Sequence, residues 1–98
     1  MTDSTTVVDN PDARRYELRL GSEVAGVAAY GLDGATIVFT HTVVRPAYEG
    51  RGLGSTLARE VLADARRRGL GVVAECPFIA AYVERHEEFA DLLVEADD

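Results

Sequence analysis

The alternation of apolar and polar side chains is clearest near the N-terminus. Over residues 15–20, tyrosine and leucine alternate with charged residues, and this period of two predicts a half-buried strand. Gly21-Ser22 predicts a hairpin turn into a second strand over 23–32, and Asp33-Gly34 predicts another turn. A third strand is predicted over 35–44, where nearly continuous apolar character indicates burial on both faces, as in a central strand. The three strands would form an antiparallel meander.

After position 53 the apolar spacing changes to three and four residues. This spacing predicts an amphipathic helix that ends at Gly69, with three arginines in its last turn, where positive charge suits the helix dipole. A short strand over 71–76 and two helical segments, over 78–85 and 86–94, complete the pattern. Strand, helix and strand form a βαβ unit with a right-handed crossover, so its two strands run parallel. The order β-β-β-α-β-α-α predicts an α+β fold, an α/β sandwich in which the meander leads into the parallel unit.

The composition limits the chain to one small domain and narrows its partners. Its 98 residues hold one core, which we place at 13–94, between an N-terminal tail over 1–12 expected to be disordered and an acidic tail over 95–98. A net charge of −7 argues against nucleic acid and against an anionic membrane surface as partners. The first residues lack signal-peptide features and the single cysteine fits a reducing compartment, so we expect a cytoplasmic protein. Two histidines and one cysteine give no zinc spacing, and we expect no metal site.

A glycine-rich turn joins the third strand to the first helix. Gly50, Gly52 and Gly54 allow close approach of the backbone to a ligand, and the first N–H groups of the helix are free to bind an anion. The turn is neither a P-loop, because it lacks the lysine, nor a dinucleotide fingerprint, because its spacing differs. Ligands of parallel sheets bind beyond the carboxyl ends of the strands, which here lie near Val44 and Cys76. The sequence therefore predicts a cleft between the glycine turn and Cys76, with a turn that binds nothing as the alternative.

The stretch over 41–62, together with Cys76-Pro77-Phe78 and Tyr82, resembles the GNAT superfamily of acetyl-CoA-dependent N-acetyltransferases, in particular its short stand-alone branch. The superfamily's motif A, Arg/Gln-x-x-Gly-x-Gly/Ala at the start of a helix, corresponds to residues 49–54. One departure is Glu49, which stands where the motif has Arg or Gln. A carboxylate there would repel a pyrophosphate, so we expect the Glu49 side chain to point away from the ligand.

The resemblance implies a binding site for acetyl-CoA or coenzyme A along the cleft. The edge of the third strand would pair with the pantetheine arm, the glycine turn would hold the pyrophosphate, and the segment from Cys76 would line the far side of the arm. The implied cofactor-binding residues are Thr42, Val43, Val44, Arg51, Gly52, Leu53, Gly54, Ser55, Pro77, Phe78 and Arg85. Full-size members carry further elements around the acceptor pocket, so we expect an acceptor site that is open or completed by a partner. An exposed sheet edge would allow a homodimer.

Three side chains are candidate catalytic residues, and each has a structural alternative. Cys76 would accept the acetyl group before the amine does, line the cofactor without covalent chemistry, or serve as a small buried hydrophobe. Tyr82 would protonate the leaving thiolate, like the superfamily's tyrosine, or lie in the core with its hydroxyl at the surface. His41 would act as a base toward the amine, directly or through water, or make a structural hydrogen bond.

We therefore predict an N-acetyltransferase that transfers an acetyl group from acetyl-CoA to an amine of a small molecule or to an exposed protein amine. The alternative function is a CoA-binding module without catalysis, or an interaction domain, on the same scaffold. The function of such a module would survive the loss of Cys76 and Tyr82, whereas the enzyme would lose its catalytic residues.

Overall fold

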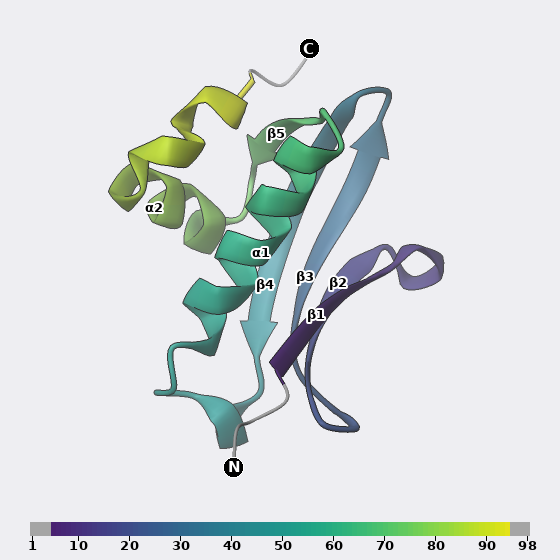
Figure 1. The fold of residues 1–98 in the computed structure, drawn as a ribbon, viewed down its shortest axis with the longest axis vertical. Helices are drawn as coiled ribbons and strands as arrows, with labels where there is room; N and C mark the ends of the chain where they lie inside the picture. The colour runs from purple at the N-terminus through teal and green to yellow at the C-terminus, as the bar shows by residue number, and fades with distance from the viewer. Residues whose placement is uncertain (1–4, 95–98) are drawn as a thin grey trace.

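The computed structural model describes residues 5–94, which form a five-stranded sheet with helices packed against it (Figure 1). The strands are β1 (Thr5–Asn10), β2 (Arg15–Leu20), β3 (Glu23–Asp33), β4 (Thr36–Val44) and β5 (Gly71–Ala74). The α-helices are α1 (Leu53–Arg67) and α2 (Pro77–Arg85), and the 3-10 helices are η1 (Pro11–Ala13), η2 (Pro46–Tyr48) and η3 (Glu87–Leu92). The predicted meander, the first helix and the strand after it are confirmed.

The order of strands in the sheet follows the chain, β1-β2-β3-β4-β5. The first four strands pair antiparallel, and β5 pairs parallel to β4 after the crossover through α1. This mixed sheet confirms the predicted α+β class. Among the described residues, no helix combines the length and apolar character needed to cross a membrane.

One apolar core lies between the sheet and the helices. Figure 1 shows α1 crossing one face of the sheet, with α2 and η3 beside it near β5. The alternation predicted for β2 is confirmed for Tyr16 and Leu18, which are buried in this core, but not for Glu17 between them, which is buried as well. The largest side chains without solvent exposure are Phe39, Leu18, Ile37, Leu57, Leu62, Ile79, Val61 and Val72. Because β4, α1 and α2 all contribute to this core, their ends are fixed relative to one another.

The prediction that residues 1–12 form a disordered tail is wrong for residues 5–12. Residues 5–10 form β1, which pairs along its whole length with β2, from Thr5 opposite Leu20 to Asn10 opposite Arg15. The Asn10 side chain also accepts a hydrogen bond of 3.4 Å from the N–H of Ala13, which caps η1. The apolar run here is too short to mark a strand, and pairing with β2 decides the structure instead. Residues 1–4 and the acidic tail predicted over 95–98 lie outside the described residues.

The prediction that the third strand is buried on both faces is also wrong. In β4, Ile37 and Phe39 are buried, whereas His41 is exposed and Val43 is 52% exposed. The β3–β4 register shifts by one residue at Thr40, which has no partner opposite it in the described pairing. This shift is a β-bulge, which reverses the alternation of the side chains that follow it.

The edge of β4 that faces β5 is paired over only half its length. β5 ends at Ala74, opposite Phe39, and the last pairing contact is the N–H of Cys76 with the carbonyl of Phe39 at 2.9 Å. Beyond this point, residues 40–44 have no strand on this side in the described part of the chain. The fold therefore leaves a free strand edge that leads toward the glycine turn.

The first helix ends where the sequence predicts. The N–H of Gly69 binds the carbonyl of Arg66 at 3.1 Å, and the N–H of Leu70 binds that of Ala65 at 2.9 Å. These two bonds form a Schellman motif, which satisfies carbonyls at the helix end and turns the chain back toward β5.

Candidate functional site

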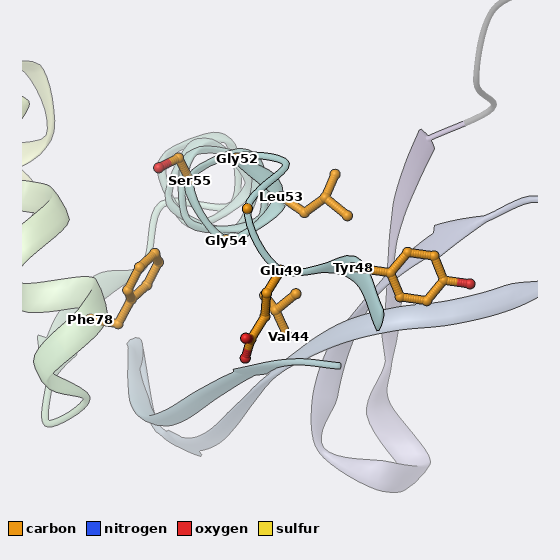
Figure 2. A pocket seen from close by; sticks show the side chains of 9 residues that line it. Val44, Tyr48, Glu49, Gly52, Leu53, Gly54, Ser55 and Phe78 are labelled. Atoms are coloured by element: carbon orange, nitrogen blue, oxygen red, sulfur yellow. The ribbon is translucent and has the colours of Figure 1, made fainter. Parts of the chain in front are cut away.

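A pocket of about 250 Å³ opens where β4 leaves the sheet and α1 begins (Figure 2). Its walls are the end of β4, the glycine turn, the first turn of α1 and the first turn of α2. The lining residues are Val44, Tyr48, Glu49, Gly50, Gly52, Leu53, Gly54, Ser55 and Phe78. The pocket thus lies at the carboxyl end of β4, where the sequence places the cleft.

The floor of the pocket is the N-terminus of α1. Gly52 precedes the helix with φ 74° and ψ 14°, a left-handed conformation that favours glycine. The N–H of Thr56 makes the first bond into the helix, to the carbonyl of Gly52 at 3.2 Å. The N–H groups of Leu53, Gly54 and Ser55 have no backbone acceptor within residues 5–94. Together with the helix dipole, these free donors form a site for an anion.

The wall opposite this turn is the ring of Phe78, which stands 40% exposed on α2. A Cβ atom at position 54 would lie 2.9 Å from the tip of this ring, so a larger residue there would displace the Phe78 side chain. The absence of a side chain at Gly54 also leaves the helix backbone open to the pocket. Gly54 and Phe78, both predicted to bind the cofactor, therefore shape the pocket through their mutual contact.

Tyr48 is a pocket residue that the sequence analysis missed. Its hydroxyl donates a hydrogen bond to the carboxylate of Glu23 at the start of β3, and this bond raises the pKa of Tyr48. The guanidinium of Arg51 lies over the Tyr48 ring, 5.4 Å from its centre. In the sequence, the only indication that Tyr48 lines the pocket is its place as an aromatic residue between Pro46 and the glycines. Arg51 was expected at the pyrophosphate, but here it contacts Tyr48 and does not line the pocket.

The expectation that Glu49 points away from the pocket is wrong. Its side chain lines the pocket, and Figure 2 shows the carboxylate beside Val44, opposite Phe78. The backbone places it there: η2 ends at Glu49, whose N–H binds the carbonyl of Pro46 at 3.3 Å. Glu49 is thus the residue that follows η2, and the glycine turn leads from it to α1.

Cys76 lies outside the pocket lining but beside the same strand edge. Its side chain is 2% exposed, and its thiol donates a hydrogen bond of 3.4 Å to the hydroxyl of Thr42. Thr42 is two residues before Val44 on β4, so the thiol lies further along the edge that leads out of the pocket. Glu75 is exposed while Cys76 is buried, which keeps that carboxylate away from the sulfur.

The other candidate catalytic residues lie apart from the pocket. The ring of Tyr82 stacks on His86 with centres 3.9 Å apart and packs near Phe89 of η3. His86 also binds the carbonyl of Tyr82 through Nδ1 at 2.9 Å, so it must donate that proton. His41 is exposed and pairs with Ala29 on β3. The geometry does not bring Tyr82 or His41 to the pocket lining.

The remaining predicted site residues flank the pocket or lie farther from it. Thr42 and Val43 belong to the free half of β4, Pro77 begins α2, and Arg85 ends it, exposed. Over residues 5–94, no group of three or more His, Cys, Asp and Glu side chains is placed to hold a metal ion. The pocket therefore offers backbone donors for an anion, and the unpaired edge of β4 leads from it toward the thiol of Cys76, which lies outside the pocket lining.

Comparison with known proteins agrees with this geometry. The family model described as GCN5-related N-acetyl-transferase matches residues 15–92. Among solved structures, a GCN5-like candidate N-acetyltransferase from Staphylococcus aureus, determined in solution by NMR, superposes with a TM-score of 0.69. The two sequences are 20% identical, and the match covers 94% of this chain and 90% of the other. No curated protein sequence matches this chain.

Proposed function

Because the chain belongs to the GCN5-related N-acetyltransferase family, we propose that this acetyltransferase takes its acetyl group from acetyl-CoA and transfers it to an amine. The observation that carries the proposal is the pocket at the N-terminus of α1, where three free N–H groups meet the free edge of β4. A diphosphate fits the first feature, and the amide-bearing pantetheine arm fits the second.

In this proposal, different residues around the pocket contact different parts of acetyl-CoA. The N–H groups of Leu53, Gly54 and Ser55 would donate to the diphosphate, and Arg51 would move from Tyr48 to add a charged contact. The backbone of residues 42–44 would pair with the amides of the pantetheine arm. Phe78 would cover the arm from the side of α2.

When bound, acetyl-CoA supplies an acetyl group activated as a thioester. Cys76 stands beside Thr42 on the edge that the arm would follow, which supports the proposal that its sulfur attacks the carbonyl carbon. The thiol proton would then pass to the departing CoA sulfur, and an amine would take the acetyl group from Cys76 and restore the thiol. Direct attack by the amine is the competing route.

The net charge of the chain supports the proposed class of acceptor. The chain carries a net charge of −7, which favours the approach of cationic amines. We propose a small amine or an exposed protein amine as the acceptor and the cytoplasm as the location, where acetyl-CoA and a reduced thiol coexist.

Binding of the cofactor is tested by thermal denaturation of the full chain with CoA and acetyl-CoA. At about a hundredfold excess over the dissociation constant, a ligand stabilises the folded state by about 2.7 kcal/mol. We expect a rise in Tm that grows with the logarithm of CoA concentration, and no comparable rise with adenosine. An unchanged Tm at millimolar CoA would refute the proposed function.

The role of Cys76 is tested by intact mass after incubation with acetyl-CoA and no amine. We expect a single acetyl adduct on the wild-type protein and none on Cys76→Ala, which keeps a small buried side chain. Full amine acetylation by Cys76→Ala at the wild-type rate would show that transfer is direct.

A further inference from the structure

The pocket that holds the diphosphate in the proposed function has a negative wall. Of its lining residues, Glu49 is the one acidic side chain, and none is basic. Figure 2 shows its carboxylate at the β4 side of the pocket, across from Phe78 and below the first turn of α1. The carboxylate therefore lines the same pocket as the turn to which the proposed diphosphate binds.

The backbone position of Glu49 at the pocket is held by neighbouring contacts. Its φ of −67° and ψ of 152° and its bond to Pro46 belong to the end of η2. Tyr48, the preceding residue, is held to Glu23 on β3 by its hydroxyl. The backbone therefore holds the Cα atom of Glu49 at the pocket, and in this structure its side chain lines the pocket.

The nearest arginines along the chain do not neutralise this carboxylate. Arg51 lies over the ring of Tyr48, and Arg45 donates to the carbonyl of Val24 at 3.2 Å. Neither side chain lines the pocket, and the ion pairs of residues 5–94 do not include Glu49. In this arrangement the pocket combines attractive backbone donors with one repulsive side chain. The contact that Arg51 would add to the bound diphosphate offsets part of this repulsion, and the Glu49 carboxylate stays without an ion-pair partner among the described residues.

We propose that Glu49 determines donor specificity by opposing the diphosphate, an inference that rests on the proposed function. Repulsion acts on ligands that bring a charged diphosphate to the N-terminus of α1, and it spares ligands that bind only along the edge of β4. With its backbone donors alone, the site would strongly prefer CoA thioesters over thioesters of pantetheine, which lack the nucleotide diphosphate. The Glu49 carboxylate makes this preference smaller. Glu49 is a specificity-determining residue that lowers the preference for the nucleotide part of the donor.

The experiment measures the dissociation constants of CoA and pantetheine for the wild-type protein and for Glu49→Gln, which keeps the shape and removes the charge. At low salt we expect Glu49→Gln to bind CoA about tenfold more tightly, as removal of one close like charge predicts, with pantetheine affinity unchanged. The gain in CoA affinity should shrink at high salt, because screening removes the repulsion that the variant abolishes.

A matched control is Asp12→Asn, which removes the same charge from η1, at an exposed position outside the pocket lining. We expect its CoA affinity to equal that of the wild-type protein. Equal CoA affinities of wild type and Glu49→Gln, or an equal gain for pantetheine, would overturn the inference and leave the proposed function intact. Failure of both proteins to bind CoA would refute the proposed function and the inference together.

Discussion

At the scale of single residues, the most tightly held charge is Glu17, on β2. The residue is 2% exposed, and its carboxylate accepts hydrogen bonds from Arg19 at 2.6 Å, Asn10 at 3.0 Å and Arg15 at 3.0 Å. These bonds, led by that of Arg19, lower the pKa of Glu17 to about 2. Asn10 lies on β1, so the carboxylate joins two strands as well as pairing two arginines.

This arrangement predicts how stability changes with acid. A carboxylate whose pKa is depressed in the folded state contributes stability above its unfolded pKa, near 4.5, and that contribution is lost as pH falls toward about 2. We expect Glu17→Gln to lower the free energy of unfolding at pH 7 by about 1–3 kcal/mol. The difference between wild type and variant should shrink between pH 4.5 and 2, measured by urea denaturation.

The control for this prediction is Glu84→Gln, an exposed position on α2. We expect its denaturation midpoint to follow the wild type at each pH. Stability curves of wild type and Glu17→Gln that stay parallel from pH 7 to acid would show that Glu17 contributes through shape and not through charge.

At the scale of elements, α1 and α2 meet at the pocket through Gly54 and Phe78. Glycine in a helix costs about 1 kcal/mol relative to alanine, so Gly54→Ala gains helix stability. The new Cβ atom displaces the Phe78 ring, which it would otherwise approach to 2.9 Å. Overpacking costs about 1–3 kcal/mol of stability and offsets this gain, so we expect Tm to change little. We expect CoA affinity to fall about tenfold, because the displaced ring lines the pocket.

Gly31→Ala on β3 is the matched control, because a Cβ atom there meets no atom within 4 Å. Calorimetric titration with CoA compares the two variants. An affinity of Gly54→Ala equal to the wild type would mean that Phe78 leaves the pocket wall when the ligand binds.

The sequence predicts these elements better than it predicts the side chains of the site. Periodicity, turn residues and the Gly69 stop act over neighbouring residues, so β2, α1 and their boundaries follow from the sequence. Whether Glu49 faces the pocket depends on how η2 ends, and whether Arg51 reaches the pocket depends on the ring of Tyr48. Such choices are made by three-dimensional neighbours, which a pattern along the chain does not contain.

At the scale of the whole molecule, the sheet depends on its first strand. Beyond the pairing with β2, Asp9 on β1 accepts a hydrogen bond of 2.5 Å from the hydroxyl of Tyr30, and Arg68 lies 3.5 Å from the same carboxylate. β1 thus connects β3 and the end of α1, although the sequence pattern suggested a tail. Desolvation and this bond raise the pKa of Tyr30 to about 12, so the tyrosine stays neutral.

Deletion of residues 1–10 tests the contribution of β1. Net hydrogen-bond contributions of about 1 kcal/mol each, summed over the lost pairings, predict a loss of about 3 kcal/mol or more. We expect a clear drop in Tm by circular dichroism, and a smaller drop for Asp9→Asn, which keeps the strand. A truncated chain with the wild-type Tm would restore the disordered-tail interpretation.

The agreement between strand order and chain order has a consequence for how the molecule folds. Three of the four strand pairings join consecutive segments through short turns, and such local contacts form early and fast. Only β5 must wait for α1 to close the crossover, and the pocket exists only after that step. We therefore expect CoA to slow unfolding while leaving the folding rate unchanged, because the ligand recognises a part of the molecule that is absent from the early meander.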